Sequence, residues 1–177
     1  MTPVIIIGSR KDTALERLIK DVLSTTYNIT YIKENSMTSA GSGYELICFD
    51  SERPRLKGIE NAVIIAKRSA VLPDDLPKSC TVILDPDSPG QLGAVISGGN
   101  FAVDCGISPT STVSFSSESA DTLVISLNRS IKALSGREIQ PLELPVRKYR
   151  ADAYTLMSFT ALRLLLDDFD SELGKLI

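Results

Sequence analysis

The chain has 177 residues, a length that predicts one domain with its own hydrophobic core. Apolar residues make up 43% of it, and 19 basic against 22 acidic residues leave a net charge of −3. This composition excludes a disordered polyelectrolyte and argues against a dedicated nucleic-acid-binding protein. The sequence contains no histidine, which excludes histidine metal ligands and Ser-His or Cys-His catalytic pairs.

The sequence predicts a cytoplasmic protein that does not enter a membrane. Its first apolar run, residues 4–7, is too short for a signal peptide, and we find no run of the roughly 18 apolar residues that a membrane helix requires. The three cysteines are an odd number and each lies in an apolar segment. We expect Cys48, Cys80 and Cys105 to be buried free thiols in a reducing compartment.

The first half of the chain, residues 1–98, alternates strands with helices. A helix is predicted after Asp12 or Thr13, with Thr13 and Glu16 at the spacing of a capping box. A second helix is predicted to begin at Ser88-Pro89 and to turn Leu92, Val95 and Ile96 toward the sheet. Residues 34–43 are polar and loop-like. The predicted strands are Pro3–Ile7, Tyr27–Ile32, Tyr44–Phe49, Ala62–Ala66 and Cys80–Leu84.

The second half, residues 99–177, is rich in strands. Pro141 and Pro145 in the last of these strands indicate a sheet edge, and Ser135-Gly136 precede it as the turn of a hairpin or longer excursion. A final helix over 151–168 is apolar nearly all round, so it should be buried on more than one side. The predicted strands are Phe101–Cys105, Thr112–Ser116, Thr122–Leu127 and Glu138–Val146.

These elements predict a three-layer α/β fold over residues 1–177: a mostly parallel sheet flanked by helices, with an antiparallel β-excursion in the second half. Their order resembles the central, ATP-binding domain of the Mur ligases, which have a phosphate loop after the first strand. Residues 5–13, Ile-Ile-Ile-Gly-Ser-Arg-Lys-Asp-Thr, occupy that place here. Residues 103–106, Val-Asp-Cys-Gly, resemble the family's later glycine-ending strand, and the layout also resembles that of short proteins from Firmicutes bacteria.

The departures from the family pattern indicate that its chemistry has been lost. Lys11 stands where the phosphate loop has a glycine, and Asp12 where it has the phosphate-binding lysine; only Gly8 and Thr13 fit. The family's Asp-His and His-Asn pairs cannot be present without histidine, and its two flanking domains have no counterpart. The resemblance therefore implies a degenerate relative that neither binds MgATP tightly nor hydrolyses it.

One candidate site follows from the place of this loop at the end of a strand and the start of a helix, where anions tend to bind. A carboxylate or phosphate would bind there, or the segment is an ordinary turn with solvated basic side chains. We assign no catalytic residue, metal ion or cofactor. The candidate ligand-binding residues are Gly8, Ser9, Arg10, Lys11 and Thr13.

Three other groups of residues have a functional and a structural interpretation. Asp50, Asp85 and Asp87 end strands on one edge of the sheet. There they would act either as Mg²⁺ ligands or as turn caps. Four serines at 114, 116, 117 and 119 have no general base of the histidine type, and they are typical of an edge strand. Arg147, Lys148 and Arg150 form a basic patch, which either binds an anionic partner or is ordinary solvated surface.

Two functional hypotheses remain. The protein is a non-catalytic, Mur-ligase-like module that acts by binding a partner or its own copy, or it is a small nucleotide- or anion-binding protein or enzyme that uses the loop after the first strand.

The excess apolar surface of the final helix predicts a homodimer through residues 151–169, since large exposed apolar patches are uncommon on soluble monomers. Light scattering at micromolar concentration should give twice the monomer mass. The competing expectation is that the β-excursion covers this helix within one chain.

Overall fold

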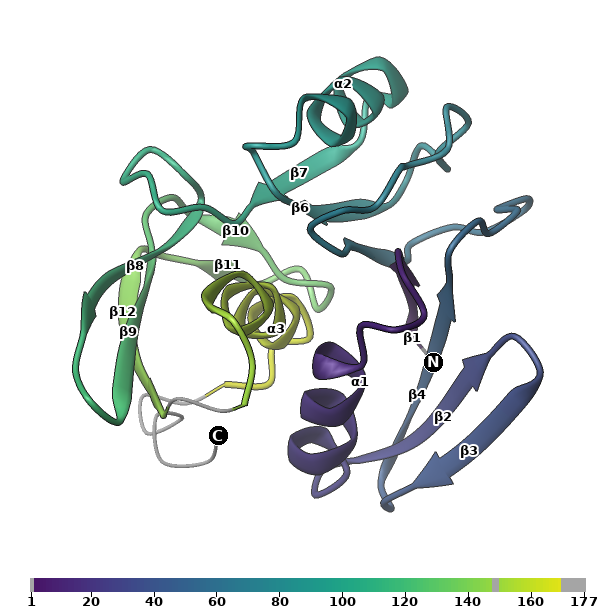
Figure 1. Cartoon of the computed structure of the whole chain (residues 1–177), viewed down its shortest axis with the longest axis horizontal. Helices are drawn as coiled ribbons and strands as arrows, with labels where there is room; N and C mark the ends of the chain where they lie inside the picture. Colours follow the sequence, from purple (N-terminus) through teal and green to yellow (C-terminus); the bar gives the residue numbers. More distant parts are fainter. Residues whose placement is uncertain (1, 148–149, 170–177) are drawn as a thin grey trace.

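The computed structural model describes residues 2–147 and 150–169. Its main element is a seven-stranded sheet in the order β3-β2-β4-β1-β5-β6-β7, in which only the edge strand β3 is antiparallel to its neighbour (Figure 1). The strands are β1 (Thr2–Ile7), β2 (Tyr27–Lys33), β3 (Ser36–Ala40), β4 (Tyr44–Ser51), β5 (Val63–Ala66), β6 (Thr81–Leu84) and β7 (Phe101–Asp104).

Helices cover both faces of this sheet, and a smaller sheet packs on the outer side of the helices that cover one face. One face carries α1 (Ala14–Leu18), continued by the π-helix η1 (Ile19–Leu23), and α3 (Ala153–Leu165); the other carries α2 (Pro89–Gly98). The smaller antiparallel sheet has the order β12-β9-β8. Its strands and the adjoining hairpin are β8 (Val113–Glu118), β9 (Thr122–Leu127), β10 (Ile131–Lys132), β11 (Glu138–Ile139) and β12 (Leu142–Arg147).

The first strand lies at the centre of the large sheet, as its uninterrupted apolar sequence predicts. β1 pairs with β4 on one side and with β5 on the other, in parallel. Val4 and Ile6 belong to the hydrophobic core around α1 and α3, whereas Ile5 and Ile7 belong to the core on the α2 face. The expected mixed α/β fold with a mostly parallel sheet and additional antiparallel strands is confirmed.

The final helix is covered within one chain, which was the competing expectation. Every side chain from Tyr154 to Leu165 is buried, and α3 lies between the large sheet and the strands of the small one (Figure 1). The argument for a dimer through residues 151–169 therefore loses its premise, because the β-excursion already covers the apolar surface of this helix. Self-association itself stays a prediction.

Residues 34–43, predicted to be a loop, contain the edge strand β3. Four of its five residues are exposed, so the strand shows no alternation of apolar and polar side chains. It is defined by backbone pairing with β2, from Ile29 opposite Ala40 to Lys33 opposite Ser36. The strand predicted over 138–146 is in turn divided into β11 and β12 next to Pro141, and β12 forms the edge of the small sheet.

The capping box predicted for the first helix does not form. The Ala14 amide donates to Asp12 Oδ1 at 3.2 Å, and the Thr13 hydroxyl accepts from the Arg17 guanidinium at 3.0 Å. Glu16 pairs with Lys20 and Lys33, the latter on the neighbouring strand β2. These ion pairs draw the Glu16 carboxylate away from the helix start that it would have capped.

The second helix is rotated relative to the prediction. Val95 is buried, but Leu92 and Ile96 are exposed, and Gln91 takes the inner position. The Gln91 amide donates to the carbonyl groups of Lys67 and Ala70 at 2.9 and 3.2 Å, and its Oε1 accepts from the Asp85 amide at 3.0 Å. A buried amide must keep such bonds, so Gln91 sets which face of α2 meets the sheet.

We predict that Met157→Ala lowers the free energy of unfolding by about 2–5 kcal/mol, because it leaves a cavity in the core beneath α3. Met157 is 1% exposed, whereas Met37 on β3 is 74% exposed. Met37→Ala should therefore change stability by less than about 0.5 kcal/mol. Urea unfolding of both variants measures the difference, and equal effects would contradict this description of the core.

Candidate functional site

The loop between β1 and α1 contains all the predicted ligand-binding residues. It lies at the carboxyl edge of the sheet, where α/β proteins commonly bind ligands. Gly8 is buried, Ser9 and Thr13 are partly exposed, and Arg10 and Lys11 are exposed. The Arg10 guanidinium forms ion pairs with Glu34 and Glu52, so this predicted anion ligand already has carboxylate partners.

Most backbone amides of this loop donate to acceptors of the protein itself. Such amides are the donors with which a phosphate loop holds its anion. The Gly8 amide donates to the Ser51 carbonyl, the Arg10 amide to Glu52 Oε1 at 3.0 Å and the Asp12 amide to the Ser9 carbonyl at 3.1 Å. The Lys11 amide donates to Ser9 Oγ, and the Ala14 amide to Asp12 Oδ1.

A buried ammonium group lies against the carbonyl side of the loop. Lys67, the residue after β5, places its Nζ 3.0 Å from the Ser9 carbonyl oxygen and 2.8 Å from that of Asp12. The same Nζ is 3.1 Å from each carboxylate oxygen of Asp50, at the end of β4. An ammonium has three N–H donors, and these four oxygens engage all of them.

Asp50 is fully buried and has a structural role. Besides Lys67 it accepts a hydrogen bond from the Tyr31 hydroxyl at 2.9 Å. Burial, followed by the neighbouring Asp50 carboxylate, raises the pKa of Tyr31, so the phenol stays a donor. The sequence indicated Asp50 as a Mg²⁺ ligand or a cap, and the structure shows a third role, as the counterion of Lys67.

Gly8 permits this arrangement. Its φ of +140° is unfavourable for other residues, and a Cβ atom at this position would lie 2.7 Å from Lys67 Cβ. The glycine that resembled the start of a phosphate loop therefore makes room for the stem of Lys67.

The other predicted carboxylates form a turn. Asp85 Oδ1 accepts from the Asp87 amide at 3.0 Å, and Asp85 Oδ2 accepts from Arg68 Nε at 3.3 Å. Among the described residues there is no group of three or more cysteines and carboxylates placed to hold a metal ion.

The predicted cysteines are confirmed as buried free thiols. Burial raises the pKa of Cys48 to about 12, which leaves it protonated and unreactive near neutral pH.

The serine stretch and the basic patch lie on the small sheet and after it. Ser114 is buried and accepts from Asn128 Nδ2 at 2.9 Å, while Ser116, Ser117 and Ser119 are exposed on or just after the edge strand β8. Arg147 and Arg150 are exposed, and Lys148 lies outside the described residues. Within the part of the chain described, no helix is long and apolar enough to cross a membrane.

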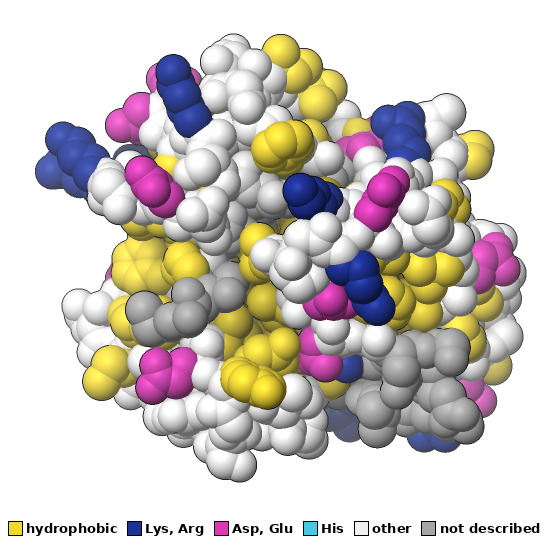
Figure 2. Space-filling model, turned by 180° about the vertical axis from the view of Figure 1, so that it is seen from behind, with side chains coloured by type: hydrophobic (Ala, Val, Ile, Leu, Met, Phe, Trp, Pro, Cys, Tyr) yellow, Lys and Arg dark blue, Asp and Glu magenta, His cyan; other side chains and the backbone are white. Residues whose placement is uncertain are grey.

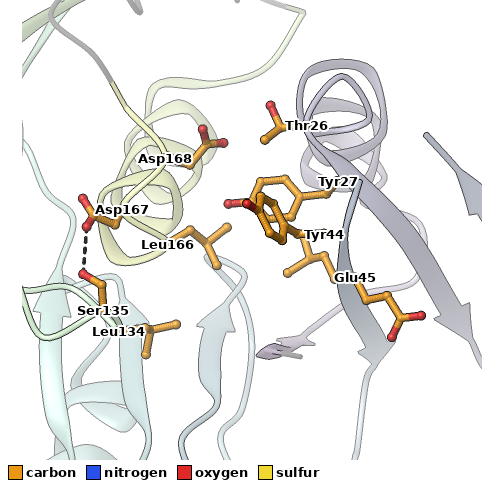
Figure 3. Close-up of a pocket in the computed structure, with 10 residues that line it drawn as sticks. Thr26, Tyr27, Tyr44, Glu45, Leu134, Ser135, Leu166, Asp167 and Asp168 are labelled. Atoms are coloured by element: carbon orange, nitrogen blue, oxygen red, sulfur yellow. Dashed lines mark hydrogen bonds between the residues drawn. The ribbon is translucent and has the colours of Figure 1, made fainter. Parts of the chain in front are cut away.

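A pocket that the sequence did not indicate lies at the opposite end of the sheet, where β2 and β4 begin. Its volume is about 540 Å³, and Tyr27 and Tyr44 lie side by side on one wall, across from Leu134 and Ser135 (Figure 3). Burial, followed by the Asp168 carboxylate, raises the pKa of Tyr27 to about 12. Asp167 and Asp168 are paired with Arg137 and Arg163, so neither aspartate offers the pocket a free charge.

No protein-family model and no curated protein sequence matches this chain. Solved structures do match it. A UDP-N-acetylmuramoyl-L-alanyl-D-glutamate–2,6-diaminopimelate ligase superposes with a TM-score of 0.62 over 100% of the chain, at 13% identity. A murein peptide ligase from Psychrobacter arcticus superposes with a TM-score of 0.57 over 93% of the chain, at 9% identity.

The fold is Mur-ligase-like. The match covers 46% and 44% of those two proteins, so this chain spans about half of their length. At such low identity the likeness establishes the fold alone. No local motif indicates Lys67: it is the first of two basic residues, Lys67 and Arg68, that follow an apolar strand. Its partners lie 17 to 58 residues away along the chain.

We predict that Lys67→Met destabilises the protein by about 3–5 kcal/mol, because it leaves the Asp50 carboxylate buried without its counterion. The matched control Lys11→Met removes an exposed ammonium from the same loop and should cost less than about 0.5 kcal/mol.

The double variant Asp50→Asn/Lys67→Met tests the cause. Removing both charges should cost less than the sum of the single changes by more than about 1 kcal/mol, as measured by urea unfolding. Additive costs would show that the two groups do not stabilise each other.

Proposed function

We propose that this chain is a non-catalytic protein with a Mur-ligase-like fold that acts by associating with a partner protein or with its own copy. The observation that carries the proposal is the position of the Lys67 ammonium within hydrogen-bond distance of Ser9, Asp12 and Asp50. In a working phosphate loop, amides and a lysine point at the bound phosphates. Here the lysine donates to the protein.

The hydrogen bonds of the loop support this proposal. An incoming phosphate needs several donors, and the amides of Gly8, Arg10, Lys11 and Asp12 are already paired. Freeing Lys67 for a ligand would leave Asp50 as a buried, uncompensated carboxylate, which is costly. The anion-binding hypothesis would therefore require the loop to break its own bonds before it gained any from a ligand.

The charge at residue 12 supports the proposal independently. Asp12 is exposed at the position where a phosphate loop has its lysine. A unit charge 4 Å from a phosphate is worth about 4 kcal/mol at an effective dielectric constant of 20. Reversing its sign disfavours a nucleotide by several kcal/mol, before screening.

We predict that MgATP at 1 mM shifts the melting temperature by less than 1 °C. A ligand present at 100 times its dissociation constant would add about 2.7 kcal/mol, or roughly 5–10 °C for a chain of this size. Differential scanning fluorimetry with a Mur ligase as positive control makes this measurement, and calorimetry tests the same binding directly.

The matched variant is Arg10→Ser, which removes one of the two exposed cations among the predicted ligands of the loop. Saturable MgATP binding by the natural chain would overturn the proposal. Its loss in Arg10→Ser would then assign that binding to the loop and favour the nucleotide- or anion-binding hypothesis.

A further inference from the structure

The solvent-facing side of α2 is apolar and uncharged. Its ten residues include no acidic or basic side chain, although six of them are exposed. Leu92 and Ile96, one helical turn apart, are 37% and 70% exposed and form a ridge along the helix. Hydrophobic side chains gather at the top of the space-filling view, where Figure 1 places α2 (Figure 2).

A groove runs beside this ridge. It has a volume of about 690 Å³ and lies between α2 and the segment 69–74, with Val71 85% exposed at its rim. The helix contributes only small side chains to it, and an added Cβ at Gly90 or Gly93 would meet nothing within 4 Å. The groove is therefore open, and wide enough for branched side chains from outside. Its lining from α2 is Ser88, Pro89, Gly90, Gly93, Ala94 and Ser97.

We propose that this face binds a second copy of the chain, with the ridge of each α2 seated in the groove of the other. This inference rests on the proposed function and names the partner and surface of the association. In a two-fold interface the same patch meets itself, so a ridge and a groove on one patch can complement each other twice.

The absence of charge on α2 favours a copy of this chain as the partner. The protein carries a net charge of −3, so two copies repel weakly wherever their charged surfaces meet. The helix α2 itself carries no charge, so repulsion between two copies is smallest along it. The charged residue in the lining of the groove is Asp74, which is exposed on the wall facing the helix. The short helix limits the contact to several hundred Å² per partner, the size of a weak and reversible dimer.

Sedimentation equilibrium of the full chain tests the proposal from about 1 µM to about 300 µM, a range that covers weak dimers. We expect the average mass to rise toward twice the monomer mass. Ile96→Lys should weaken association at least tenfold. The matched control Met37→Lys changes an equally exposed side chain on β3, at the far edge of the sheet from β7, and should leave it unchanged.

Gly93→Leu separates loss of the interface from loss of the fold. The new side chain enters open space in the monomer and replaces a poor helix former, so the melting temperature should stay the same or rise. It fills the groove, so association should be lost.

A chain that stays monomeric up to about 300 µM overturns this inference. So does a dimer that Ile96→Lys and Gly93→Leu leave intact. Neither outcome affects the MgATP measurement, which separately tests whether the loop between β1 and α1 binds a nucleotide.

Discussion

The buried ion pair between Lys67 and Asp50 is the contact on which the rest of the site depends. A buried charge is tolerated only when it is paired and hydrogen-bonded. Here the Lys67 ammonium and the Asp50 carboxylate neutralise each other and are hydrogen-bonded. Asp50 ends β4, Lys67 follows β5, and the loop after the central strand β1 closes over both. The pair joins the carboxyl ends of three neighbouring strands, so it holds the edge of the sheet where a ligand would otherwise enter.

This pair explains how the loop differs from the phosphate loop that its sequence resembles. The loop has Asp12 where a phosphate loop has its lysine, and the Lys67 ammonium, from the residue after β5, lies against the carbonyl oxygens of the loop instead. That charge is neutralised by Asp50 and is engaged by the carbonyl groups of the loop. Gly8 is needed here because a Cβ atom at this position would clash with the Lys67 side chain. A glycine in such a loop can therefore have a steric role unrelated to phosphate.

The sequence predicts the parallel strands well, since β1, β5 and β6 are buried apolar runs between turn residues, and β1 has its expected central place. Local patterns fail where a distant partner decides the outcome. β3 is a strand because β2 pairs with it, and the capping box does not form in part because the Glu16 carboxylate pairs with Lys33 on β2. Of the candidate site, the loop was predictable from its place after β1. Its lysine partner was not, because that contact joins residues 58 positions apart.

The orientation of α2 about its axis links the loop between β1 and α1 to the exposed apolar ridge of Leu92 and Ile96. The Lys67 side chain reaches into the loop after β1, while its backbone carbonyl accepts from Gln91 of α2 at 2.9 Å. Gln91 takes this inner position because its amide completes the bonds of the turn that follows β5. Leu92 and Ile96 are turned outward as a consequence. The turn that carries Lys67 thus contributes to two features at once: its ammonium is bonded to the carbonyl groups of the loop after β1, and its backbone orients the helix that exposes Leu92 and Ile96.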